Sequence, residues 1–391
     1  MAYSIDKSII FQKNARFACV CAFFVVPLSH IMAGIYIHIP FCKSRCKYCD
    51  FFSTTRLEQR TLYVQALLAE WRDRQHELRE PITTIYLGGG TPSTLSIDSL
   101  RLLSNEITIL HHPTQLEFTL EANPGDITPE RVDAWRQLGI NRLSIGVQSF
   151  DDNLLRLLGR RHTASQAREA IRTAQNAGFD NISIDLMYAL PSQTMEQWRH
   201  DVAEVLRLGM QHVSCYGLIY EEGTAMTNLL ATNQIQAVDE DTEMQMYDYL
   251  IEQLSTHGFE HYEVSNFALP GRHSRHNSSY WCDTPYLGLG AGAHSYDGHT
   301  RQWNICDLDL YIRQALSHQL QPEREVLSDE ERHTERVMLG LRTSRGVSQQ
   351  DIDMHRAQTL IESGLLTMRG DRICATTEGY HILNRLIEQL L

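Results

Sequence analysis

YIHIPFCKSRCKYCDFF, residues 36–52, is the stretch that decides which fold and which chemistry this chain is expected to have. It begins as an alternating apolar strand, and because side chains alternate along a strand, Tyr36 and His38 are expected to share one face. Three cysteines follow in a C-x3-C-x2-C loop: Cys42, Cys46 and Cys49. Three thiolates on one short loop can converge on a single inorganic centre, so the stretch predicts a metal site directly after a strand.

Zinc and an iron–sulfur cluster are the two kinds of centre that such a loop could hold. A structural zinc site takes four ligands, so His38 or a distant cysteine would have to complete the set, and the sequence has no second C-x2-C pair. A four-iron cluster with three protein ligands leaves one iron open, whereas iron–sulfur electron carriers normally use four cysteines. An open iron indicates chemistry on a bound substrate or cofactor.

The composition is that of a folded globular protein, with 42% hydrophobic and 21% charged residues among 391. A net charge of −13 argues against a nucleic-acid partner, because phosphate contacts need clustered Lys and Arg. The nine cysteines are an odd number with one closely spaced group, which argues against a disulfide framework. We expect the scattered cysteines to be buried small apolar residues: Cys215, Cys282, Cys306 and Cys374.

The first 31 residues resemble a secretory signal, because Lys7, Lys13 and Arg16 precede an uncharged run over residues 17–28. That run is shorter than the roughly 20 apolar residues needed to span a bilayer. Export would also carry the thiol loop into an oxidising compartment. We therefore expect translation to start at Met32, with residues 1–31 an extension outside the folded protein.

Strand-like and helix-like segments alternate from residue 34 to about residue 267, with strand candidates at residues 34–40, 82–90, 116–124, 142–150, 181–191 and 212–222. This alternation predicts an α/β fold with a parallel sheet, either open or closed into a full or partial barrel. In both arrangements the chemistry collects at the carboxyl ends of the strands. Glu121, Gln148 and Asp185 would be unusual in buried parallel strands, so we expect them to line a polar cavity.

The character of the chain changes from about Leu308, where helices precede a hairpin that turns at residues 370–371. This order indicates a winged-helix-like, mostly helical C-terminal domain. From residue 325 onward there are 8 Arg, no Lys and 11 acidic residues, so packing against the main domain is favoured over DNA binding. The expected divisions are the extension 1–31, a core domain 32–267, a connecting region 268–324 and a C-terminal domain 325–391.

The cysteine loop, with an aromatic residue before its last cysteine, resembles the signature of the radical S-adenosylmethionine (SAM) superfamily, whose core is a partial (β/α)6 TIM-like barrel. The resemblance implies a [4Fe-4S] cluster on the three cysteines, with the amine and carboxylate of SAM on the open iron. In such proteins the cofactor carries the chemistry, and protein groups hold and orient it. The implied cofactor contacts are Tyr36, Tyr48, Gly88, Gly89, Gly90, Thr91, Glu121, Gln148, Arg160 and Asp185.

Four motifs between Met32 and the C-terminus, IYIHIPFC, GGGTPS, GVQSFD and DLMYALPSQT, resemble the oxygen-independent coproporphyrinogen III oxidase family. Two functions occur there: the oxidase removes carboxylate from propionate side chains by radical chemistry, and the HemW subfamily comprises heme chaperones. The oxidase carries a further cysteine two residues after the third ligand, where this chain has Phe51. The oxidase also has a long region ahead of the cluster strand, with no folded-looking counterpart in residues 1–31. Both differences favour the chaperone, with the oxidase as the alternative, so whether the chain is an enzyme stays open.

The segment HNSSYW, residues 276–281, matches an H-N-x-x-Y-W motif of the chaperone branch. A neutral imidazole can ligate heme iron, and flat rings supply apolar area, so the resemblance predicts heme contacts at His276, Tyr280 and Trp281. Alternatively, the aromatic residues only pack two domains together. His273, His294 and Cys282 compete as iron ligands. The implied partners are heme and heme-accepting proteins, with a homodimer left open, in the cytoplasm or at the inner face of the membrane.

Overall fold

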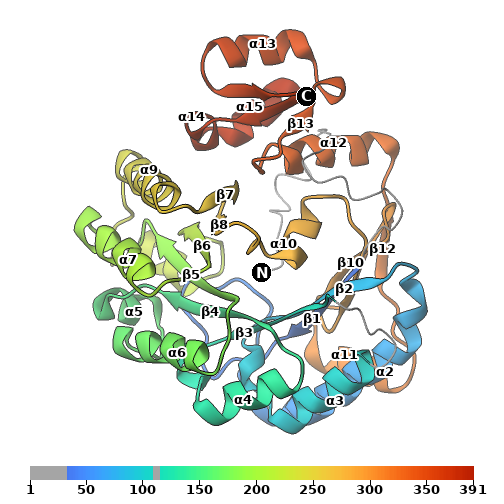
Figure 1. The fold of residues 1–391 in the computed structure, drawn as a ribbon. Coiled ribbons are helices and arrows are strands. Elements are labelled where there is room, and N and C mark those ends of the chain that lie inside the picture. The colour runs from blue at the N-terminus through green and yellow to red at the C-terminus, as the bar shows by residue number, and fades with distance from the viewer. Residues whose placement is uncertain (1–32, 109–114) are drawn as a thin grey trace.

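The computed structural model describes residues 33–108 and 115–391 of the chain (Figure 1). The expectation for residues 1–31 lies outside the described residues. Cys19 and Cys21 lie outside them as well.

A curved twelve-stranded sheet forms the body of the described part of the chain, in the order β12-β11-β10-β9-β1-β2-β3-β4-β5-β6-β8-β7. Its centre consists of six parallel strands: β1 (Ala33–Ile39), β2 (Ile82–Gly89), β3 (Glu117–Ala122), β4 (Arg142–Gln148), β5 (Ile182–Tyr188) and β6 (His212–Gly217). The sheet begins and ends with different strands, so the barrel is not closed. These strands confirm the predicted α/β fold with a partial barrel.

Helices cover the outer face of the parallel strands (Figure 1): α2 (Arg60–Arg74), α3 (Ile97–Thr108), α4 (Pro129–Gln137), α5 (Asp152–Leu158), α6 (Ala164–Asn176) and α7 (Met195–Arg207). Local sequence sets several of their ends. α6 and α7 begin with capping boxes at Thr163 and Thr194, and Gly178 and Gly209 follow their last turns with positive φ. Ile35, together with the other β1 isoleucines, belongs to the hydrophobic core, which leaves the opposite face of β1 for the interior of the barrel.

Additional strands extend both edges of the sheet. After α8 (Ala225–Ala231) and α9 (Glu240–Thr256), β7 (Glu260–Glu263) and β8 (Asn266–Ala268) continue the sheet beyond β6. On the other edge, β9 (Tyr286–Leu289) pairs in parallel with β1, and β10 (His294–Tyr296), β11 (Thr300–Trp303) and β12 (Glu323–Val326) continue outward. The helices of this part are α10 (Arg275–Tyr280) and α11 (Leu308–Leu316). Residues 286–303, which lie in the region expected to be connecting, thus supply three strands of the main sheet.

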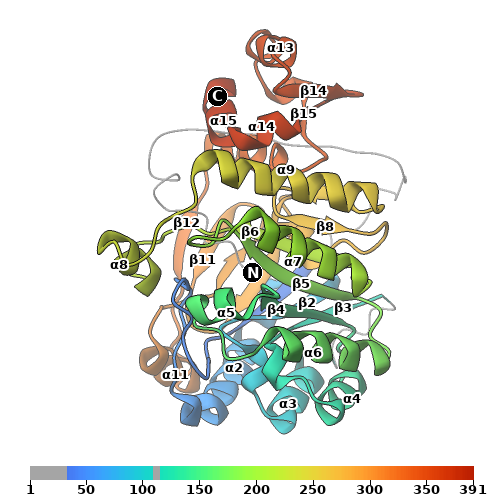
Figure 2. The ribbon, with the colours of Figure 1, turned by 90° about the vertical axis from the view of Figure 1, so that its left-hand side faces the viewer.

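The C-terminal residues form a small separate layer with its own hydrophobic core. It contains α12 (Asp329–Gly340), β13 (Val347–Ser348), α13 (Met354–Glu362), β14 (Leu366–Arg369), β15 (Arg372–Ala375), α14 (Thr377–His381) and α15 (Leu383–Leu390). The β14–β15 hairpin turns at residues 370–371, as predicted, and β13 completes a three-stranded sheet. This unit lies against α9 (Figure 2), where His381 Nε2 is 2.8 Å from an Asp248 carboxylate oxygen.

None of the helices in the described part of the chain combines the length and the apolar character that a membrane crossing requires.

Candidate functional site

A cavity lies where the carboxyl ends of β1 to β5 meet, as expected for a parallel α/β sheet. Residues from the cysteine loop and from all five strand ends line it. The predicted contacts among the lining residues are Tyr36, Cys42, Cys46, Tyr48, Cys49, Gly89, Gly90, Thr91, Glu121, Gln148, Arg160 and Asp185. Gly88, His276, Tyr280 and Trp281 are predicted contacts that do not line it.

The cysteine loop is held over the cavity by backbone hydrogen bonds to distant segments. Cys42 N donates to Thr54 O at 2.9 Å, Lys47 N donates to Leu158 O at 3.0 Å, and Met226 N donates to Lys47 O at 2.8 Å. These bonds tie the loop to the end of α5 and the start of α8, which limits its freedom to move away from the strand ends.

The three thiols face the cavity with different partners. Cys42 Sγ lies 3.4 Å from Thr91 Oγ1, and Arg160 Nη1 donates to Cys46 Sγ at 3.4 Å. Burial raises the pKa of Cys42 and raises that of Cys49 to about 12, so a cationic centre is needed to hold these groups as thiolates near neutral pH. Within the described part of the chain, no three His, Cys, Asp or Glu side chains are grouped as ligands of one metal ion.

The glycine run at the end of β2 allows two strand ends to approach closely. Gly89 has φ +108°, and a Cβ there would lie 2.5 Å from the His38 ring. A Cβ at Gly90 would lie 2.8 Å from the carbonyl carbon of Pro40. The resemblance implies that these glycines contact a ligand. In the structure they also have to be small because His38 and Pro40, at the end of β1, leave no room for a side chain.

Two carboxylates enter the cavity from β3 and β5. Glu121 accepts a hydrogen bond from the Tyr86 hydroxyl at 2.8 Å and one from Gly89 N at 3.1 Å. Asp185 accepts a hydrogen bond from Ser144 Oγ at 3.2 Å. Burial, followed by the nearby Glu121 charge, raises the pKa of Asp185 to about 6. The cavity thus holds two carboxylates that differ in how completely protein donors satisfy them.

Arg160 brings a guanidinium to the same cavity. One Nη donates to Cys46 Sγ, the other donates to Gly146 O, and the buried Nε has no hydrogen-bond partner in the structure. A buried donor without a partner is unusual, and a planar fork of donors suits a carboxylate. Gln148, nearby on β4, has φ +69° beyond a register shift in that strand. Such conformations are uncommon for residues other than glycine and concentrate at functional sites.

Several cavity residues were not predicted, although the sequence carries a signal for some of them. Ser144 and Gly146 line the cavity and lie four and two positions before Gln148 on β4. Strand alternation places all three on one face, so the period of two could have identified them. No comparable signal exists for Lys43 or Ser53, which lie in loops and line the cavity through tertiary packing.

His38 lies on the interior face of β1 with Tyr36, and both of its ring nitrogens have partners. Nδ1 lies 3.0 Å from the Tyr36 hydroxyl, and Nε2 lies 2.9 Å from Phe52 O. Burial lowers the pKa of His38, which favours the neutral ring. These contacts describe a hydrogen-bonded buried histidine.

The HNSSYW segment lies apart from the cavity. Its first five residues belong to α10, which lies inside the arc of strands near their amino ends (Figure 1). His276 is 0% exposed, while Tyr280 and Trp281 are partly buried.

The prediction that the scattered cysteines are buried is right for Cys215 and Cys374 and wrong for Cys282 and Cys306, which are exposed.

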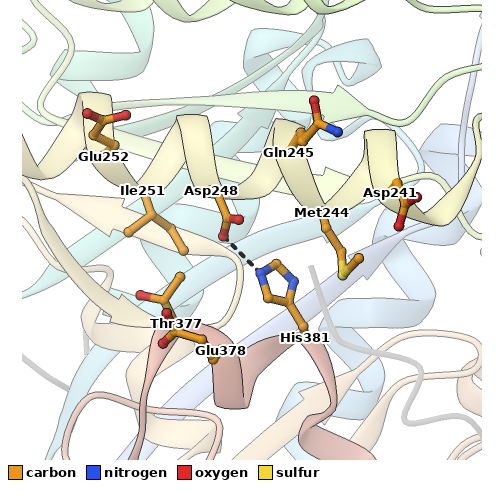
Figure 3. A pocket seen from close by; sticks show the side chains of 9 residues that line it. All are labelled: Asp241, Met244, Gln245, Asp248, Ile251, Glu252, Thr377, Glu378 and His381. Atoms are coloured by element: carbon orange, nitrogen blue, oxygen red, sulfur yellow. Dashed lines mark hydrogen bonds and ion pairs between the residues drawn. The ribbon is translucent and has the colours of Figure 1, made fainter. Parts of the chain in front are cut away.

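A second pocket lies between α9 and α14 (Figure 3). Four acidic residues line it together with Met244 and His381: Asp241, Asp248, Glu252 and Glu378. None of the predicted contacts lines this pocket. Its carboxylates would repel the propionates of a porphyrin, so it does not suit heme.

This chain matches two domain families, and it is similar to known proteins along most of its length. The family model "Radical SAM superfamily" matches residues 36–205, and "HemN C-terminal domain" matches residues 327–382. The heme chaperone HemW of Lactococcus lactis is 38% identical over 369 residues, covering 91% of this chain and 96% of that protein. HemW of Bacillus subtilis is 38% identical over 323 residues, covering 81% of this chain and 85% of its own. The chain belongs to the HemW family.

The chain is thereby placed with the coproporphyrinogen III oxidase family inside the radical SAM superfamily, as predicted. The solved structure of coproporphyrinogen III oxidase (HemN) from Escherichia coli superposes with a TM-score of 0.78 at 21% identity, covering 98% of each chain. At that identity the likeness concerns the fold. Radical SAM membership implies a [4Fe-4S] cluster and SAM as cofactors of this HemW chain. The donor set of the cavity, with three thiols, a guanidinium and two carboxylates, is chemically suited to both.

Proposed function

We propose that this chain is a heme chaperone that binds heme and transfers it to acceptor proteins, with a [4Fe-4S] cluster and SAM in the strand-end cavity. The observation that carries the choice over the oxidase is Phe51, which lines the cavity at the position where the oxidase has its further cysteine. An apolar ring there removes a thiol from the reaction space. The names of the Lactococcus lactis and Bacillus subtilis relatives support the same choice.

In this proposal the protein groups bind and orient the two cofactors. Cys42, Cys46 and Cys49 hold the cluster, and when bound, the reduced cluster supplies an electron that can cleave the sulfonium of SAM. Arg160 would donate to the carboxylate of SAM through the Nε that has no partner in the structure, while Glu121 and Asp185 would accept hydrogen bonds from the amine and ribose of SAM. Tyr36, Tyr48, Gln148 and the segment from Gly88 to Thr91 complete the contacts.

Heme is proposed to bind at the HNSSYW segment, where Tyr280 and Trp281 offer flat apolar area. Among the candidate iron ligands, Cys282 and His294 are exposed, His273 is half-exposed, and His276 is buried. Axial ligation by one ring nitrogen of His276 would require the hydrogen bond at that nitrogen, to Thr84 or to Tyr280, to break. Acceptor proteins are proposed to receive the heme in the cytoplasm or at the inner face of the membrane.

Hemin titration of the anaerobically reconstituted protein tests the chaperone proposal. We expect a saturable Soret band with a stoichiometry of about one heme per chain, because one HNSSYW segment is present. Variants Cys282→Ser, His294→Phe and His273→Phe identify the ligand by the change in band position. Absence of a saturable band in the native protein would refute heme binding.

Incubation with coproporphyrinogen III, SAM and a reductant tests the alternative. We expect no decarboxylated product beyond one turnover, since Phe51 stands where the oxidase has a cysteine. Catalytic formation of product would establish the oxidase function and overturn the chaperone proposal.

SAM affinity should depend on pH through Asp185. Its pKa of about 6 in the folded protein lies above the ordinary value, so the carboxyl is mostly protonated at pH 5 and ionised at pH 7. Ionised Asp185 is the better acceptor for SAM hydroxyl and ammonium groups. We therefore expect affinity to rise about tenfold from pH 5 to pH 7, matching the increase in ionised fraction. Equilibrium dialysis of labelled SAM measures this, and Asp185→Asn should flatten the profile; an unchanged slope in that variant would exclude Asp185 as its origin.

The same shift affects stability with the opposite sign. A raised pKa means that the fold favours the protonated carboxyl, so the contribution of Asp185 is fully present below its unfolded pKa near 4 and is lost as pH rises through about 6. The predicted rise with pH therefore concerns SAM affinity and not stability. SAM affinity increases with the ionised form of Asp185, which the fold without SAM disfavours.

A further inference from the structure

Helix α10 is built into the interior of the barrel by contacts with three parallel strands. The Glu117 carboxylate at the start of β3 accepts hydrogen bonds from Arg275 N at 3.1 Å and from His276 N at 3.0 Å. Gly34 on β1 makes room for the helix, because a Cβ there would lie 3.1 Å from His276 Nδ1 and 2.8 Å from Thr84 Oγ1. The helix therefore lies near the amino ends of the strands whose carboxyl ends line the cavity.

The imidazole of His276 is fixed at both nitrogens within this space. Nδ1 lies 2.8 Å from Thr84 Oγ1 on β2, and Nε2 lies 2.8 Å from the Tyr280 hydroxyl. Burial lowers the pKa of His276 to about 3, so the ring is neutral at physiological pH. A fixed, neutral, fully buried ring is a packing surface for whatever lies above it.

Tyr86 lies above that ring and connects it to the cavity. The rings of His276 and Tyr86 stack with centroids 5.1 Å apart and an interplanar angle of 24°, and Tyr36 stacks on both at 6.4 Å and 6.2 Å. The Tyr86 hydroxyl then donates to Glu121 at 2.8 Å, while Gly89 N donates to the other carboxylate oxygen at 3.1 Å. A continuous path of contacts thus leads from α10 to a carboxylate that lines the cavity.

We propose that His276 is a positioning residue for SAM binding, which holds Tyr86 and through it the Glu121 carboxylate at the cavity. This inference rests on the proposed contact between Glu121 and SAM. Close packing gives Tyr86 a single orientation as long as His276 fills the space beneath it. By linkage, SAM binding should in turn stabilise α10.

Three variants separate the contacts along this path. Tyr86→Phe removes the hydroxyl that donates to Glu121 and keeps the ring, His276→Ala removes the stacked ring, and His276→Phe keeps a ring of similar size. In cluster-reconstituted protein at pH 7.5 we expect SAM affinity to fall roughly tenfold for Tyr86→Phe and for His276→Ala, as for loss of a hydrogen bond to a charged group. His276→Phe should bind SAM within about threefold of the native protein, because it restores the packing.

His212 provides the matched control for a purely structural role. It is a second buried histidine at the start of a parallel strand, with Ser183 Oγ 2.7 Å from Nδ1 and the Tyr262 hydroxyl 2.7 Å from Nε2, and its ring packs on Tyr262. His212→Ala should lower the melting temperature, as His276→Ala does, but leave SAM affinity unchanged. Equal losses of SAM affinity in the two alanine variants would overturn the positioning role.

Two further measurements keep the inference testable if His276→Ala does not fold. Hydrogen exchange of the native protein should show slower exchange at the Arg275 and His276 amides when SAM is added, and unchanged exchange there would count against the proposal. Native SAM affinity in Tyr86→Phe would overturn it as well. Glu121→Gln separates the proposed Glu121 contact with SAM from the positioning role of His276. Normal SAM binding in this variant refutes the Glu121 contact. Weakened SAM binding in this variant, together with native SAM affinity in Tyr86→Phe, refutes only the positioning role.

Heme binding distinguishes positioning from ligation. If His276 positions Tyr86, the variant His276→Phe should bind hemin with an unchanged Soret band. The reason is that the native His276 ring is buried away from solvent and would not ligate the heme iron. Loss or displacement of that band would identify His276 as the iron ligand and overturn the inference.

Discussion

Replacing Cys42, Cys46 and Cys49 together with serine should reduce the iron content of the anaerobically purified protein from about four atoms per chain to near zero. Serine hydroxyls are not deprotonated near neutral pH and are poor ligands for iron–sulfur clusters. SAM binding should be lost with the cluster, because the amine and carboxylate of SAM would bind to its open iron. Iron and acid-labile sulfide assays, with the visible absorbance of the cluster, measure the outcome.

Cys306→Ser is the matched control, since Cys306 is exposed and does not line the cavity. This variant should retain iron and sulfide at the native level. Purified native protein that contains stoichiometric zinc and no sulfide would refute the cluster, and with it the proposed SAM site. Hemin binding should survive in the triple serine variant, because the HNSSYW segment lies apart from the cysteine loop.

Replacing Arg160 with methionine should weaken SAM binding on the order of 100-fold while the cluster stays in place. The guanidinium lines the cavity with a buried Nε that has no partner in the structure, so a SAM carboxylate would supply the missing acceptor. Methionine fills a similar volume but donates no hydrogen bond. Equilibrium dialysis with labelled SAM, together with an iron assay, measures the two effects separately.

Arg160→Lys should recover part of the affinity, because lysine keeps the positive charge but lacks the planar fork of donors. Arg156→Met is the control at an exposed arginine of α5 that lies outside the cavity, and it should bind SAM normally. Native affinity in Arg160→Met would remove Arg160 from the SAM site. Loss of iron in this variant would instead show that its contact with Cys46 supports the cluster.

Much of the fold could be predicted because its signals are local. The six parallel strands are short β-branched or aromatic runs that end at Gly, Pro or polar residues, and helix ends coincide with glycines such as Gly178 and Gly209. The strands β9 to β11 were not predicted, because each has only three or four residues, too few to show a clear alternation. In addition, β9 pairs with β1, which is distant in sequence. Gly288 illustrates the point, because a Cβ there would overlap the carbonyl oxygen of His294, a contact that no local pattern reveals.

The candidate site divides in the same way. Spacing and strand alternation predicted that the cysteine loop, Tyr36, Glu121 and Asp185 would meet at one polar cavity, and the structure brings these residues together there. Loop residues such as Ser53 reach the cavity only through the path of the chain in space. The exposure of Cys282 and Cys306 likewise depends on which elements cover them, so composition alone misassigned both.

The sequence by itself determined that three thiols follow the first strand within one short loop, and that alternate residues of the parallel strands turn polar groups toward a shared interior. Covalent connectivity and strand geometry decide these features, and both act over a few residues. Only the tertiary structure decided that HNSSYW supplies a helix inside the barrel and that His276 packs beneath Tyr86 instead of facing solvent. Burial of that ring depends on β1, β2 and β3 surrounding a segment about 160 to 240 residues away in the chain, a distance over which no sequence pattern acts.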